Sequence, residues 1–366
     1  MPVEPLPGFL QKLPAIHVAP AIFVKIGRDP SMPHSTAQRS SMSDSRLFKY
    51  SNWDALNVAI IPLHISFFVW LAYEYHNLSP LVLIALIPVL FAISLQNAGA
   101  NHNHYHTPFF SKRWLNTLTR MGFSMTAAPK TPHNIGHGLH HATHRSWNDD
   151  SLLETLGLKR PVHQQLLAFA QYVLESLGLK YLVLLYLLKR WPSERLAAFV
   201  SPKELELGTK FFDKIKAPHK LREAKLDLAA WMFFRILLCA IDWKFFFFYF
   251  VPTAYLIDTI RLAENFLQHW GASDPYDSTR DSVSSYGSLY NGLTFNLGYH
   301  QEHHYRPGAH WLQLPSLTAD LPADRRTVPF THYINVPVVY PRFAAQLAEQ
   351  AKNGVDGEPA TQGSSA

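Results

Sequence analysis

The stretch Tyr299-His300-Gln301-Glu302-His303-His304 carries three histidines at positions i, i+3 and i+4. On a helix these positions share one face, so the three imidazoles point toward one region. The same spacing recurs upstream at His137, His140 and His141. Still further upstream, His102 and His106 form a simpler pair four residues apart. Neutral imidazole is the commonest metal ligand in proteins. The pattern predicts a multi-histidine metal centre held by helices.

The composition indicates a membrane protein. Hydrophobic residues make up 48% of the 366 residues and charged residues only 16%, whereas about 25% charged is typical of a soluble chain. The apolar residues form long blocks flanked by Lys and Arg, so we interpret the net charge of +6 as membrane anchors rather than a nucleic-acid surface. Cys239 is the only cysteine, which excludes an internal disulfide and a thiolate metal site.

Four apolar blocks predict transmembrane helices arranged in two hairpins. The first hairpin covers residues 55–73 and 80–95, and the second covers residues 226–241 and 245–260. These blocks are close to the length needed to cross a hydrocarbon core of about 30 Å. Arg235 lies inside one of them, where a charge facing lipid would be costly.

The sides of the membrane follow from the basic residues. Arg46 and Lys49 precede the first hairpin, and Lys112 and Arg113 follow it, which places both ends in the cytoplasm. A further apolar stretch, residues 164–189, is interrupted by polar side chains, and we favour a helix lying in the interface over a span. The sequence therefore predicts an all-α integral membrane protein with about four transmembrane helices and a cytoplasmic helical cap holding the histidines.

Three segments are expected along the chain. Residues 1–50 form a polar, proline-containing N-terminal segment without the order of a signal peptide. Residues 51–320 form the membrane domain, and residues 321–366 form a C-terminal tail that is expected to be partly disordered.

The number of histidines indicates two metal ions rather than one. Adjacent residues on a helix differ in direction by about 100°, so His140 and His141 are suited to different ions a few ångströms apart. The two clusters and the upstream pair supply eight histidines, which exceeds the coordination of a single ion. Nitrogen-rich sites with open positions suit redox iron, although zinc and copper also accept imidazole.

The order of the clusters, HxxxH then HxxHH then HxxHH, resembles the membrane fatty acid desaturase and hydroxylase superfamily, a set of non-haem di-iron oxidases. The run from Asn296 to Pro307, followed by Trp311 and Leu314-Pro315, is similar to that family's third box. The resemblance extends from about Trp53 to Pro315. The chain departs from the family at His102-Asn103-His104, where an acidic residue commonly follows the first histidine.

The resemblance implies a set of site residues. Asn265-Phe-Leu-Gln-His269 matches a motif in which the histidine is a ligand and the asparagine holds a metal through water. The implied set binds two iron ions, with O₂ as co-substrate, through His102, His106, His137, His140, His141, His269, His300, His303, His304 and Asn265. Residues expected to orient these ligands are His104, His144, Asp149, Glu264 and Glu302.

The resemblance also implies the reaction class. We expect oxidation of a fatty acyl chain, with desaturation as the leading reaction and hydroxylation or oxidative decarboxylation to a terminal alkene as alternatives. Electrons would come from a separate donor of the ferredoxin, rubredoxin or cytochrome b5 type with its reductase. The active site would face the cytoplasm, in a bacterial inner membrane or the endoplasmic reticulum. A histidine-rich metal transporter is the distant alternative, and no nucleic-acid partner is expected.

Overall fold

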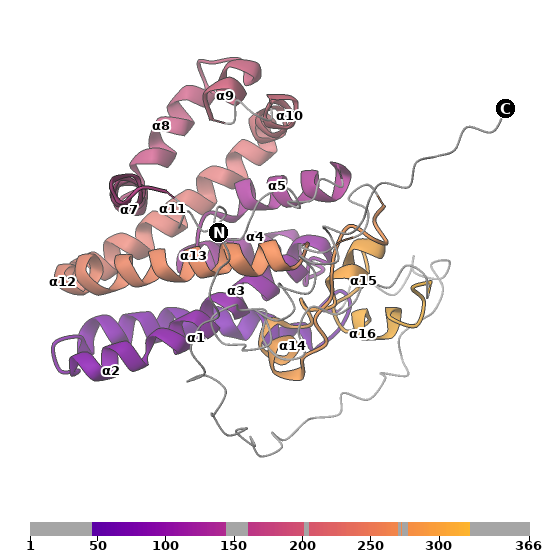
Figure 1. The fold of residues 1–366 in the computed structure, drawn as a ribbon, viewed down its shortest axis with the longest axis horizontal. Helices are drawn as coiled ribbons and strands as arrows, with labels where there is room; N and C mark the ends of the chain where they lie inside the picture. Colours follow the sequence, from indigo (N-terminus) through magenta and orange to yellow (C-terminus); the bar gives the residue numbers. More distant parts are fainter. Residues whose placement is uncertain (1–45, 144–159, 201–204, 270–271, 273–276, 323–366) are drawn as a thin grey trace, which may run out of the picture. The chain divides into compact units, whose positions relative to one another are not determined.

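The computed structural model describes residues 46–143, 160–200, 205–269, 272 and 277–322, which belong to one compact unit beginning at Arg46. The described residues fold into helices, with one isolated β-bridge between Phe48 and Phe110, so the prediction of an all-α chain is confirmed. In chain order the helices (Figure 1) are α1 (Asp54–Glu74), α2 (Pro80–Ala85), α3 (Ile87–His106), α4 (Arg113–Thr126), α5 (Lys130–Thr143), α7 (Val162–Ser176), α8 (Leu179–Leu188), α9 (Ser193–Val200), α10 (Leu205–Lys216), α11 (Pro218–Ile241), α12 (Trp243–Phe245), the π-helix η4 (Phe246–Phe250), α13 (Val251–Leu267), α14 (Ser288–Thr294), α15 (His300–Tyr305) and α16 (Leu314–Leu317).

Three stretches of the described chain are long and apolar enough to cross a membrane. They are Asp54–Glu74, Pro80–His106 and Trp243–Leu267, with 21, 27 and 25 residues. The first two correspond to the first predicted hairpin. The predicted segments 1–50 and 321–366 lie mostly outside the described residues, so these domain boundaries stay a prediction.

The stretch predicted to lie in the interface is divided into α7 and α8. Gly178 stands between them with a φ of 81°, a left-handed conformation that glycine adopts without steric cost. The two helices meet at a bend of 74°, and together they would count as a fourth span if the bent pair crosses the membrane. Length and composition are compatible with either placement.

The first helix of the second predicted hairpin is longer than the predicted block and carries charged residues. Residues 226–241 belong to the longer α11, and every 18-residue stretch of this helix contains Lys225, Asp227 and Arg235. α11 therefore lacks the composition of the three spans. The charges are accommodated because two of them are buried in protein.

Asp227 is fully buried, and it joins α11 to α4 and α5. Its carboxylate accepts a hydrogen bond from Arg120 Nε at 2.9 Å. It also accepts from the backbone nitrogen and the hydroxyl of Thr131, at 2.8 and 2.6 Å. These contacts fix the start of α5, the helix that carries the second histidine cluster.

Arg235 is buried against the end of α4 rather than exposed to lipid. Its Nη2 donates to the carbonyl of Ala127 at 3.0 Å, and its guanidinium lies 3.8 Å from the centre of the Trp231 ring. The carbonyl at a helix end is an acceptor without an intrahelical partner. The positive charge of Arg235, which would be costly if it faced lipid, is thus stabilised by a helix terminus and an aromatic face.

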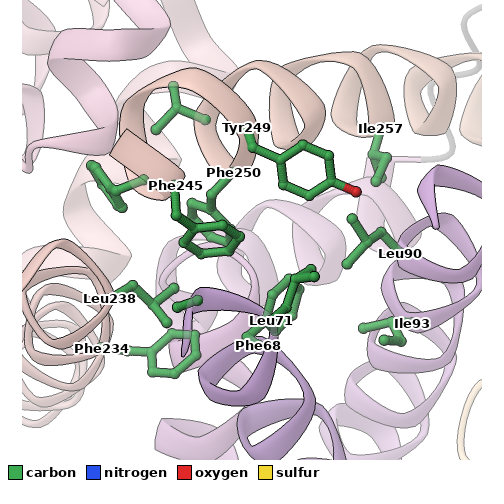
Figure 2. Close-up of a cluster of buried hydrophobic side chains, with 13 residues drawn as sticks. Phe68, Leu71, Leu90, Ile93, Phe234, Leu238, Phe245, Tyr249, Phe250 and Ile257 are labelled. Carbon is green, nitrogen blue, oxygen red and sulfur yellow. The ribbon is translucent and has the colours of Figure 1, made fainter. Parts of the chain in front are cut away.

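Apolar side chains fill the region between α1, α3, α11 and the η4–α13 segment (Figure 2). The cluster includes Phe68 of α1, Leu90 of α3, Phe234 of α11 and Phe250 of η4, with aromatic rings in edge-to-face contact. The π-turn is closed by Val251, whose N–H donates to Phe246 five residues earlier. It lies directly before Pro252, which has no N–H to continue the α-helical pattern.

Replacing Asp227 with alanine should destabilise the protein by about 3–5 kcal/mol, because Arg120 would keep a buried charge without its partner. The apparent melting temperature in detergent measures this effect. The exposed pair Lys210 and Glu206 is the matched control, since removing Lys210 should cost about 0–1 kcal/mol. Equal losses for the two variants would show that the buried pair does not hold α11 to α4.

Candidate metal centre

A close approach of α3 and α5 brings the first two histidine clusters together. A Cβ atom on Gly138 would lie 2.1 Å from the hydroxyl of Tyr105, so the glycine lets this side chain approach α5 closely. Gly138 follows His137, and Tyr105 precedes His106. The Tyr105 ring packs against both of these imidazoles, at centroid distances of 4.8 and 5.7 Å.

Five histidines from three helices form the first group, with ligand atoms within 4.8 Å of one another. They are His102, His106, His137, His141 and His303. The Nε2 atom of His137 lies 2.9 Å from that of His106 and 3.0 Å from that of His141. The Nε2 atoms of His303 and His141 are also 3.0 Å apart.

The second group lies beside the first and consists of His140, His269 and His304, again within 4.8 Å. His300 adjoins it, with its Nε2 atom 3.1 Å from that of His269. The adjacent pairs His140-His141 and His303-His304 are divided between the groups. This division is what the angle between neighbouring helical side chains requires.

The spacing of the nitrogens fits a shared ion better than direct hydrogen bonding. Two ligands on neighbouring corners of an octahedron, at metal–nitrogen distances of about 2.1 Å, lie about 3.0 Å apart. The four nitrogen–nitrogen contacts measure 2.9 to 3.1 Å. Each group therefore has the donor type and the spacing to hold a metal ion.

Asp281 orients two of the candidate ligands, although no sequence motif marks it. The Nδ1 of His304 donates to the Asp281 carboxylate at 2.9 Å, and the Nδ1 of His269 donates to the Asp281 backbone carbonyl at 2.9 Å. A proton on Nδ1 leaves the lone pair on Nε2, which is the tautomer a metal ligand needs. No local spacing links Asp281 to these histidines, so only the fold reveals it.

Several buried nitrogens on the candidate ligands find no hydrogen-bond partner in the described part of the chain. They are both ring nitrogens of His102, Nδ1 of His300 and Nε2 of His304. A buried polar atom without a partner is costly, and metal coordination removes that cost. The orphaned nitrogens support the fit of metal ions to these residues.

Burial keeps the imidazoles neutral. Burial, followed by repulsion between neighbouring histidines, holds the pKa of four of them well below 6.5. These four are His137, His300, His303 and His304. The pKa of His269 falls to about 3, because of burial and the proximity of His140. Neutral imidazoles offer lone pairs to a cation at neutral pH.

Glu302 and Glu264, both expected near the ligands, are buried and engaged. Glu302 accepts from the hydroxyls of Ser284, Tyr286 and Thr318, at 2.6, 2.8 and 2.6 Å. Glu264 accepts from the hydroxyl of Tyr290 and forms an ion pair with Arg261. Neither contacts an imidazole through these bonds, so Glu302 fixes the position of α15 and Glu264 the end of α13.

The remaining predicted residues take different positions. His104 is buried beside Phe109, and its Nε2 lies 3.3 Å from the amide oxygen of Asn116, away from both groups. Asn265 is exposed on α13, whereas the candidate ligands are buried or half-buried. His144 and Asp149 lie outside the described residues. The role of each of these residues stays a prediction.

The third histidine cluster is anchored to the start of α1. The carboxylate of Asp54 is fully buried and accepts from Nε1 of Trp311 at 2.8 Å and from Nε2 of His310 at 2.9 Å. Trp311 was part of the sequence pattern that follows the third cluster. Its hydrogen bond shows why a tryptophan there is useful, since it ties the segment after α15 to the first span.

Replacing Asp281 with asparagine should lower metal affinity about 10–100-fold, because His304 would lose the carboxylate that fixes its tautomer. Metal content after dialysis against a graded chelator series measures the change. Asp277→Asn is the control, since Asp277 accepts from Thr279 in the same segment. Unchanged metal retention in the Asp281 variant would contradict the orienting role.

The metal-free protein should lose stability as the pH falls below 6.5. The pKa of His269 is near 3 when folded, so the unfolded chain takes up a proton first and the folded state is disfavoured between pH 6.5 and about 3. The apparent melting temperature across this window measures the loss. His269→Gln should show a smaller slope, and an equal slope would argue against the contribution of His269.

Comparison with known protein families gives one match. The fatty acid desaturase family matches residues 77–333, a range that contains all nine candidate histidine ligands. No curated protein and no solved structure matches the chain. The matched range is more than half of the 366 residues and agrees with the resemblance carried by the histidine clusters. The chain therefore belongs to the fatty acid desaturase family.

Proposed function

We propose that this protein uses O₂ and two irons to oxidise a fatty acyl chain, with desaturation as the leading reaction. Membership of the family makes it an oxidoreductase of the desaturase and hydroxylase type acting on fatty acyl chains. The observation that carries the finer proposal is the division of nine imidazoles into two adjacent groups.

The residues present fit two iron ions, and the family is iron-dependent. His102, His106, His137, His141 and His303 would hold one ion, and His140, His269, His300 and His304 the other. Bound iron would supply the redox chemistry that reduces O₂ and removes hydrogen from an unactivated C–H bond.

The protein's own residues hold and shield this centre. Asp281 sets the tautomers of His269 and His304, and Glu302 holds α15 in place. Burial of His300, His303 and His304 excludes water from the reacting region. Position of the acyl chain decides between a double bond, an alcohol and a terminal alkene, so hydroxylation and oxidative decarboxylation are the alternative outcomes.

The partners and the location follow from the same proposal. The apolar helices and the family indicate an integral membrane protein whose substrate is a fatty acyl chain. We propose a cytoplasmic active site, in a bacterial inner membrane or the endoplasmic reticulum. A separate one-electron carrier of the ferredoxin, rubredoxin or cytochrome b5 type would supply the electrons.

Replacing His303 with alanine should abolish oxidation, because His303 closes the first group next to His102 and His141. Gas chromatography of lipids and hydrocarbons from expressing cells measures the products, and metal analysis of purified protein measures iron. The control His163→Ala changes an exposed histidine on α7 and should retain turnover.

Other outcomes would favour other functions. Turnover retained by the His303 variant would contradict its role as a ligand. A shortened hydrocarbon without a new internal double bond would replace desaturation with decarboxylation. Loosely held metal that exchanges across the membrane would favour a transporter.

A further inference from the structure

An apolar groove lies between α7, α11 and η4. It has a volume of about 320 Å³, and its lining includes Leu177 directly after α7, Cys239 and Ala240 of α11 and Phe246 of η4. Ile236, also in the lining, is 63% exposed, so the groove opens to the outside of the helix bundle. An exposed apolar hollow of this kind marks a surface that binds a membrane lipid, a ligand or another protein.

The size of the groove suits part of an acyl chain. A cavity of about 150 Å³ is enough to hold benzene, so about twice that volume takes a hydrocarbon of about a dozen carbons. The left-handed Gly178 turns α8 away from α7 directly after Leu177, at one edge of the groove. The bend of 74° therefore places a helix break where a chain would pass.

A separate, smaller cavity of about 50 Å³ shares one lining residue with this groove. It lies within the apolar cluster of Figure 2, among Phe68, Leu90 and Phe250. Arg235 lines both cavities, and so does α7, through Ser176 in the groove and Tyr172 in the inner cavity. Groove and inner cavity are thus neighbours on either side of Arg235.

The inner cavity shares helix α3 with the metal centre. Ser94 lines it and lies on α3, eight residues before His102, which is a distance of about 12 Å at 1.5 Å per residue. The hydroxyl of Tyr172 donates to Asp258 at 2.7 Å, and both residues line the inner cavity. This bond joins α7 to α13 across the route, and the volume there is too small for a chain until side chains move.

We propose that the groove between α7 and α11 is the site through which the acyl chain leaves the bilayer and enters the protein. The inference rests on the proposed function, because it takes the oxidised fatty acyl chain as the occupant. The methylenes fill the groove beside Cys239 and Ala240. The chain then advances past Arg235 as the bond between Tyr172 and Asp258 opens.

Cys239 gives a direct probe, because it is the only cysteine in the chain and lines the groove. The full-length protein is treated with N-phenylmaleimide in detergent, with and without a saturated fatty acid. At about ten times the dissociation constant, about one site in eleven is free, so labelling should slow about tenfold. Cys239→Ser should show no labelling and sets the background.

A filled groove should hinder substrate. Ala240→Phe places a ring in the groove and should raise KM with little change in kcat, because the metal centre is untouched. Ala229→Phe is the matched control, since Ala229 is also exposed on α11 but does not line the groove. Its KM should equal that of the unmodified protein.

The outcomes separate this proposal from the proposed function. Labelling unaffected by fatty acid, with equal KM in the two phenylalanine variants, would overturn the groove as the route. Slow labelling in phospholipid nanodiscs without added fatty acid would support it with a membrane lipid as the source of the chain. Protection of Cys239 without any oxidised product would leave the groove as an acyl-binding site and refute the proposed oxidation.

Discussion

The structure depends on keeping many imidazoles neutral and correctly oriented within a small buried volume. Nine histidines converge in two adjacent groups, and protonation of any one would set a charge against its neighbours. Burial favours the neutral form, and Asp281 fixes the tautomer of two ligands through its carboxylate and its carbonyl. The lone pairs can then point inward, which is the condition for binding a cation.

Buried polar anchors hold the histidine-bearing segments in register. Asp227 ties α11 to the start of α5, and Asp54 ties α1 to the segment after α15. Each anchor is a carboxylate that accepts more than one hydrogen bond at a site closed to water. Such hydrogen-bonded groups favour one arrangement, because a shift would remove hydrogen bonds from a buried charge. The two anchors thus fix the histidine-bearing segments relative to α1 and α11.

In the apolar cluster between α1, α3, α11 and η4, aromatic packing and the buried cation Arg235 hold the helices together. The rings of Phe68, Phe234 and Phe250 meet edge to face among α1, α11 and η4. Arg235 sits at the border, bonded to the end of α4 and shared by the two cavities. A single residue therefore links the apolar region, through which a chain could pass, to the turn before α5.

The sequence by itself determined the helical class, the first hairpin and the histidine clusters, because these depend on local spacing and on apolar length. It also indicated that adjacent histidines such as His140 and His141 serve different groups. For residues 226–241 it could not show how the charges are accommodated, since burial of Asp227 and Arg235 in protein cannot be read from composition. Tertiary structure alone decided the role of Asp281, the separation of His104 from the centre and the pairing of Asp54 with Trp311. The physical reason is that a hydrogen bond between residues 23 or 257 positions apart leaves no periodic trace in the chain, whereas a helical face does.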